Sequence, residues 1–371
     1  MTSVSRLLSD FSTMWRAAEN WEQFTWNLAG LGIRRPLATY LCHVFQPDAK
    51  APLPDAESLF RRTAEVKVNR GTLLARLELP RTSLAEDYRK GVAAVWPRPD
   101  LGYATVIALA PSFVWERVVL ARLASAPPAV SKPTLTQDAL RKLLVAIEQK
   151  LSAMRLRVRK ATSRRWVVSN RRRVLASRID WEDLSLPEAF AEARDEHKWF
   201  SSIKFEMQKA DERPTGISAL VSRHGYLQTG RTCHEFFALM APILGDVASE
   251  RYRALSGRSR ADTPGHKPRP LAVQYDQPFF RDKANNARLI SAVRRVPYFG
   301  YTVVHANPYV HVMMTDYVDG SSYDIYVLEE SRMLLIPQIR ATPGSLDRLL
   351  SGLSVHFPEG RLVEASAVYG E

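Results

Sequence analysis

The chain has 371 residues, which is enough for two or three domains with sizeable cores. Its hydrophobic residues make up 46% and its charged residues 25%, a balance that excludes a wholly disordered, collagenous or fibrous protein. Lys and Arg total 52 against 39 acidic residues, and the net charge of +13 favours a polyanionic partner.

The cysteine content and the N-terminal residues indicate the cellular compartment of the protein. Cys42 and Cys233 are too few for a disulfide framework or an all-cysteine zinc site, as is typical of a reducing environment. Arg6 and Asp10 interrupt the N-terminus, so we expect no signal peptide and a cytoplasmic protein. The uncharged run 296–315 is long enough for a membrane span, but it holds two histidines and alternates like a hairpin, which predicts sheet and no membrane.

The N-terminal part, residues 1–126, is predicted to be α/β. Apolar residues at helical spacing predict helices over most of residues 3–44. Alternating stretches at 65–68 and 72–79, and an apolar run at 103–110, predict strands. The proline-rich stretch 125–133 is typical of a linker and closes this part.

Residues 134–255 are predicted to form a basic, helical middle region. Apolar residues from Leu140 to Val158 recur at steps of four and three, which predicts one long helix with a single apolar seam. Residues 155–178 then carry ten basic side chains in 24 positions and no acidic one. A further helix is expected after the capping-box pair Ser185 and Glu188, with its apolar stripe extending to Ile203.

The C-terminal part, 271–371, follows a second linker at 256–270 that is rich in proline, glycine and basic residues. Its pattern predicts a strand, a helix, three or four antiparallel strands, a helix and a final strand. The whole chain is therefore expected to be a multi-domain α+β protein.

The basic segment is the strongest functional signal. Eight of the nine basic residues between positions 155 and 173 are arginine, whose planar fork matches two phosphate oxygens at once. A tryptophan within the segment could stack on an exposed base. These residues predict binding of DNA or RNA, and the candidate contacts are Arg155, Arg157, Arg159, Lys160, Arg164, Arg165, Trp166, Arg171, Arg172 and Arg173.

Two other interpretations of the arginines stay open. The following helix carries six acids, which an antiparallel hairpin could place against the basic segment as internal ion pairs. Alternatively, the arginines could dock an acidic protein, which would make the chain an adaptor.

A metal-dependent nuclease is a competing function. Asp55, Glu65 and Lys67 match the acid, acid-x-lysine pattern of nucleases that resemble restriction enzymes, in which carboxylates hold the metal and a lysine polarises the water or phosphate. Residues 56–64 look helical where that pattern expects strands, so the match is weak.

A C-terminal set of polar residues also resembles metal ligands in composition: His305, His311, Asp316, Asp319 and Asp324. A two-residue turn at Asp319 and Gly320 would place Asp316 opposite Tyr323. His305 and Asp316 would then lie roughly 20 Å apart, and His311 and Asp324 roughly 13 Å apart. We therefore expect no metal site and no cofactor, and favour a non-catalytic, nucleic-acid-binding subunit of a larger prokaryotic assembly.

Overall fold

The computed structural model describes residues 3–45, 65–79, 84–124, 130–151, 154–165, 176–179, 184–195, 198–209 and 214–366. The chain divides into two compact units, Met1–Glu250 and Arg251–Glu371. The first unit includes both the predicted 1–126 part and nearly all of the predicted middle region, because one sheet runs through both. None of the described helices is long and apolar enough to cross a membrane.

The first unit is built on an antiparallel sheet of eleven described strands. In sheet order the main path is β2 (Val66–Asn69), β3 (Thr72–Glu78), β4 (Lys90–Arg98), β5 (Tyr103–Ala110), β1 (Ala38–Phe45), β11 (Tyr226–Thr229), β10 (Pro214–Ser222), β9 (Lys198–Lys209), β6 (Met154–Arg165) and β7 (Ala176–Ile179). The short strand β8 (Leu184–Ser185) also pairs with β6. Pairing of β1 with β11 joins the two halves of the sheet.

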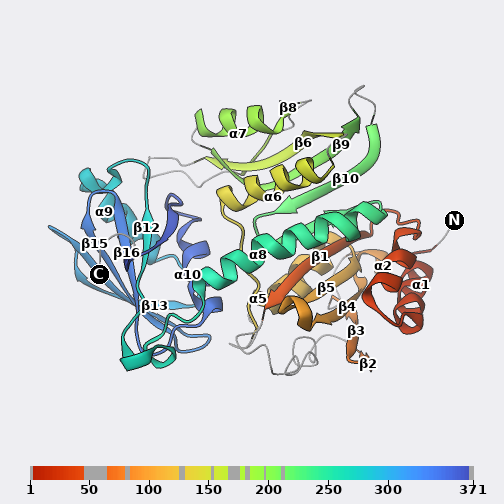
Figure 1. Ribbon diagram of the computed structural model, residues 1–371, viewed down its shortest axis with the longest axis horizontal. Coiled ribbons are helices and arrows are strands. Elements are labelled where there is room, and N and C mark those ends of the chain that lie inside the picture. The colour runs from red at the N-terminus through yellow and green to blue at the C-terminus, as the bar shows by residue number, and fades with distance from the viewer. Residues whose placement is uncertain are drawn as a thin grey trace. The chain divides into compact units, whose positions relative to one another are not determined.

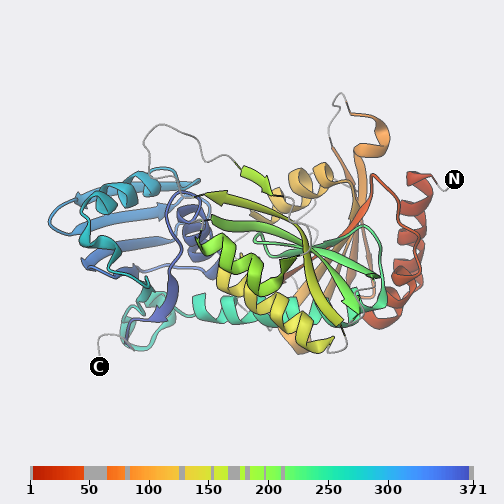
Figure 2. The same cartoon turned by 90° about the horizontal axis from the view of Figure 1, so that it is seen from above.

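Helices cover one face of this sheet from β3 to β6 (Figure 1). They are α1 (Val4–Ala17), α2 (Trp21–Ala29), α6 (Gln137–Lys150), α7 (Leu186–Asp195) and the first part of α8 (Ala241–Leu255), which follows a π-helical segment, Phe236–Met240. α6 and α7 lie side by side over the strands β6 and β9 (Figure 2). The apolar seam of α6 is buried within this unit against those strands.

A second core lies on the opposite face, but only over part of the sheet. The helical segment Ser112–Ala124 packs there through Val114, Trp115 and Val118. β1 is consequently buried on both faces, including its polar residues Thr39 and His43, whereas β9 alternates between buried and more exposed residues. The prediction of helices over most of residues 3–44 holds for α1 and α2 and is wrong over β1.

The predicted long helix from Leu140 to Val158 is also wrong in its second half. α6 begins after the N-cap Thr136 and ends at Lys150, and residues from Met154 onward form β6. From Met154 the apolar side chains alternate with arginines at a period of two, which is a strand pattern that coincides in part with the steps of four and three. The middle region is thus a mixture of helices and strands rather than a long basic helix.

The second unit matches the predicted order of elements. It contains β12 (Leu271–Gln274), α9 (Ala284–Val293), β13 (Phe299–His305), β14 (Val310–Asp316), β15 (Ser322–Glu329), β16 (Arg332–Pro337), α10 (Pro343–Leu353) and β17 (Arg361–Glu364). The antiparallel sheet order is β13, β14, β15, β16, β12, β17. Both helices pack on the same face, over alternating residues such as Val312, Ile325 and Leu335. The mixed α+β class is confirmed.

Candidate nucleic-acid interface

The arginines of β6 lie on the side of the sheet that faces away from the helices. Leu156, Val158 and Ala161 are buried in the core beneath α6 and α7. Arg155 and Arg157 alternate with these residues and therefore point to the opposite side. β6 has a bulge at Arg159, because Val158 pairs with Phe205 while Lys160 pairs with Lys204. The bulge shifts the alternation by one residue, so that Lys160 lies on the same side of the sheet as Arg157.

The neighbouring strand β9 completes this surface. Arg157 pairs with Glu206 and Lys160 with Lys204, and directly paired residues share one face of a sheet. Ser218 of β10 lies beyond Glu206 on the same face. Among the described residues, no helix covers this side of β6 and β9. We call this surface the basic face, and it comprises Arg155, Arg157, Arg159, Lys160, Lys204 and Glu206.

The six residues that define the basic face are five cations and one carboxylate. Glu206 accepts a hydrogen bond from Nε of Arg159 at 2.9 Å, and the two side chains are 20% and 33% exposed. Arg155 and Lys204 are exposed. Arg155, Arg157 and Arg159 recur at every second residue along β6, about 7 Å apart. A polyanion lying along this strand would therefore meet successive positive charges.

The acidic helix α7 packs on the other side of the sheet. Leu186, Ala189 and Ala193 are buried in the helix-covered core. Glu188 accepts hydrogen bonds from the backbone and hydroxyl of Ser185, which confirms the predicted capping box and lowers the pKa of the carboxyl, with a smaller contribution from Arg157. Glu188 is thus an acid of α7 that interacts with a cation of the basic face, Arg157.

Several predicted contacts lie beyond what the structure describes. The backbone of Arg164 and Arg165 continues β6 and pairs with Trp199 and Lys198. The other four candidates lie outside the described residues: Trp166, Arg171, Arg172 and Arg173.

Sequence reasoning missed Lys204. The expected helix through Ile203 is wrong, because α7 ends at Asp195 and β9 begins at Lys198. Alternation of Ile203, Phe205 and Met207 with polar residues was the available signal for this strand.

The candidate nuclease residues do not form a described metal site. Asp55 lies outside the described residues. Glu65 stands beside β2 and pairs with Nζ of Lys67 at 3.0 Å and with Arg76 at 3.0 Å, all three side chains being largely exposed. The hydrogen bond from Lys67 is the main cause that lowers the pKa of Glu65. Both partners of this carboxylate are cations, which compete with a metal for its oxygens.

The predicted register of the C-terminal hairpin is wrong by two residues. Thr315 pairs with Ser322, and a four-residue loop, 317–320, replaces the expected two-residue turn. Asp324 therefore pairs with Met313 and lies diagonal to His311, so that Nε2 of His311 is 3.2 Å from Oδ1 of Asp324. The expected separation of about 13 Å is thus incorrect. A bulge near the end of β13 places His305 opposite His311.

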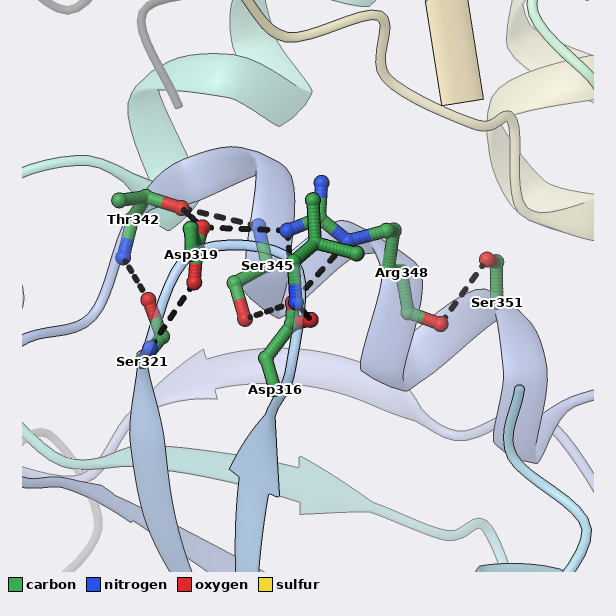
Figure 3. A network of polar contacts seen from close by, with 8 residues as sticks. Asp316, Asp319, Ser321, Thr342, Ser345, Arg348 and Ser351 are labelled. Atoms are coloured by element: carbon green, nitrogen blue, oxygen red, sulfur yellow. Dashed lines mark hydrogen bonds and ion pairs between the residues drawn. The ribbon is translucent and has the colours of Figure 1, made fainter. Parts of the chain in front are cut away.

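Asp316 and Asp319 belong to a buried polar network (Figure 3). Arg348 of α10 donates to Oδ2 of Asp316 at 2.6 Å and to Oδ2 of Asp319 at 3.1 Å. The hydroxyls of Ser345 and Thr342 donate to Asp316 and Asp319 at 2.7 and 2.6 Å. These bonds fix the loop between β14 and β15 to the start of α10, which is a structural role. Within the described ranges, no group of three His, Cys, Asp or Glu side chains could hold a metal ion.

Comparison with known proteins gives no family assignment. No model of a protein family matches the chain. No curated protein sequence matches it significantly either.

Proposed function

We propose that the protein binds nucleic acid through its basic face, by contacts with the phosphate backbone, as a non-catalytic subunit of a larger assembly. The observation that supports this most is the placement of Arg155, Arg157, Lys160 and Lys204 on one side of β6 and β9, away from the helix-covered core. Guanidinium groups bind phosphate oxygens in pairs, and clustered cations gain further from the release of counterions.

The basic face favours contact with the backbone rather than with base pairs. Its cations project from paired strands, and a sheet this broad does not enter a duplex groove as a single helix or a two-stranded ribbon does. Open antiparallel sheets are instead a recurrent surface for single-stranded nucleic acid. We therefore expect single-stranded DNA or RNA to bind at least as tightly as a duplex of the same length.

Neutralising the basic face should weaken binding. We expect Arg155→Gln, Arg157→Gln and Lys204→Gln together to raise the Kd for a labelled single-stranded oligonucleotide at least tenfold, since each charge-assisted hydrogen bond to a phosphate contributes roughly 1 kcal/mol. Fluorescence anisotropy measures this. A matched variant removes three exposed arginines elsewhere in the same unit, Arg6, Arg16 and Arg34, and should bind nearly as the natural chain does. Equal weakening in both variants would mean that net charge, and not the basic face, determines the affinity.

Removing the acidic residue of the basic face should have the opposite effect and strengthen oligonucleotide binding. Glu206→Gln removes one ion pair of Arg159 and takes one negative charge off the surface. We expect severalfold tighter binding of the oligonucleotide in the same anisotropy assay, together with a small loss of thermal stability. Unchanged or weaker binding by this variant would place the ligand elsewhere. If an acidic protein binds to the chain and displaces the oligonucleotide, the adaptor function would be favoured instead.

A further inference from the structure

The strand β13, at one edge of the second sheet, is long and carries no charge. Among the described strands it pairs only with β14, so its other side is an open edge. It has seven residues and lies within the uncharged run 296–315. Proteins usually protect an open edge by keeping the strand short or by placing charged side chains on it, because unpaired backbone groups can bind a strand of another chain.

The other described edge strands carry this protection. β2, β7 and β17 have four residues each, and β8 has two. β17 contains Arg361 and Glu364, while β2 and β7 contain Lys67 and Arg178. β13 is therefore the described edge that is best suited to pair with another strand.

The register of β13 on β14 shows which backbone groups the open edge presents. The N–H of Tyr317 donates to the carbonyl of Tyr298 at 2.9 Å, so Tyr298 directs its backbone groups toward the β14 side. This direction alternates along an antiparallel strand, and the N–H and carbonyl groups of Phe299, Tyr301 and Val303 therefore point to the open side. A bulge follows Val303, so these three residues span the regular part of the edge.

The side chains of β13 are also left partly uncovered. Tyr301 pairs with the buried Met314 and so lies on the helix-covered face, yet it is 43% exposed. Val304 is 43% exposed, and Thr302 is exposed as well. In β14, by contrast, the residues on the helix-covered face are buried, as Val312 and Met314 show. A strand that continues the sheet beyond β13 would cover these side chains and pair the open backbone groups.

We propose that two copies of this chain associate by antiparallel pairing of β13 with β13, which joins their second-unit sheets into one. A two-fold axis at Tyr301 places the two Tyr301 rings opposite each other, and Phe299 opposite the partner's Val303. In this register each outward N–H of the regular stretch meets an outward carbonyl. Aromatic–aromatic and aromatic–β-branched pairs are favourable cross-strand neighbours.

The absence of charge favours a second copy as the partner. A two-fold interface brings the same surface of both copies together, so any charge on the strand would meet a like charge close by. β13 has none, and Gly300 would lie opposite the partner's Thr302, where it leaves room for the larger side chain. The inference does not depend on nucleic-acid binding.

Sedimentation velocity of the full chain over a series of concentrations tests the association. Salt of about 0.5 M screens the net charge of +13 on each copy, including Arg294 beside Tyr301. We expect a monomer–dimer equilibrium, and Tyr301→Lys should raise the Kd of the dimer at least tenfold because the two lysines would face each other. Tyr301→Phe keeps the ring and should dimerise as the natural chain does. Tyr88→Lys, at an exposed tyrosine of the first unit, is the control and should leave the Kd unchanged.

Disulfide trapping tests the register of the paired strands. In a Cys233→Ser background, in which the other cysteine, Cys42, is buried, Tyr301→Cys should form a disulfide-linked dimer with oxidised glutathione. The two introduced thiols would lie on directly opposed residues, whose Cα atoms are about 5.5 Å apart and within disulfide range. Thr302→Cys is the matched control, since position 302 faces the partner's Gly300, and it should stay largely unlinked.

Three results would overturn the proposal. The first is a natural chain that stays monomeric at every concentration, and the second is a Tyr301→Lys variant whose Kd is unchanged. The third is a failure of Tyr301→Cys to form the linked dimer, or equal linkage of Tyr301→Cys and Thr302→Cys. Each of these results leaves the basic face untouched, because oligonucleotide binding is measured separately.

Discussion

Replacing Asp316 with alanine is expected to lower the free energy of unfolding of the second unit by about 3 to 5 kcal/mol. Asp316 is fully buried, and its Oδ2 accepts hydrogen bonds from Arg348 and Ser345. Truncation leaves a mostly buried guanidinium with only Asp319 as its acidic partner, and removes the anchor of the loop to α10. Loss of one member of a buried charged network costs more stability than loss of a surface ion pair, because the remaining charge stays desolvated.

Hydrogen exchange of the β14 and β15 amides measures this effect within the second unit. The matched control is Glu330→Ala, which removes an exposed ion pair with Arg281 in the same unit and should cost no more than about 1 kcal/mol. A loss of less than about 1 kcal/mol in Asp316→Ala would show that the network contributes little to stability.

Acidification from pH 7.5 to pH 5 is expected to destabilise the first unit by about 2 kcal/mol through His43 alone. His43 is buried between strands and the start of α8, with Nδ1 3.0 Å from the Thr105 hydroxyl and Nε2 2.8 Å from the carbonyl of Ala241. Burial is the main cause that lowers the pKa of His43 from 6.5 to about 4. As the pH falls through 6.5, the unfolded chain binds a proton that the folded chain does not, so stability decreases until the pH reaches about 4.

Urea denaturation followed by tryptophan fluorescence measures this dependence, since all eight tryptophans lie within residues 1–250. The readout is the change in stability between the two pH values. His43→Gln should reduce that change by about 2 kcal/mol, whatever its effect at pH 7.5. His266→Gln, at an exposed histidine, should leave it unaltered. An unchanged pH dependence in His43→Gln would mean that His43 takes up its proton in the folded state as well.

The sequence predicts elements well where one periodicity dominates. The order of elements in the second unit and the cap at Ser185 follow from local patterns, and local hydrogen bonds form that cap. The stretch from Leu151 to Val158 fits both a helical and a strand period, and only pairing with β9 decides between them. β1 is buried along its whole length because two separate cores cover it, which no local pattern reveals.

The candidate sites depended on register and on distant pairing. The alternation of arginines in β6 was visible, but their position beside Lys204 requires β9 to pair with β6 across more than thirty intervening residues. The contact of His311 with Asp324 was missed because a four-residue loop shifts the hairpin by two positions.

The salt dependence of oligonucleotide affinity tests the basic face most directly. Each cation that no longer neutralises a phosphate of single-stranded DNA reduces the slope of log K against log salt by about 0.7. The variant lacking Arg155, Arg157 and Lys204 should therefore show a slope about 2 smaller in magnitude than the natural chain, while the Arg6, Arg16 and Arg34 variant keeps the natural slope. Equal slopes for the natural chain and the basic-face variant would contradict phosphate binding by this surface.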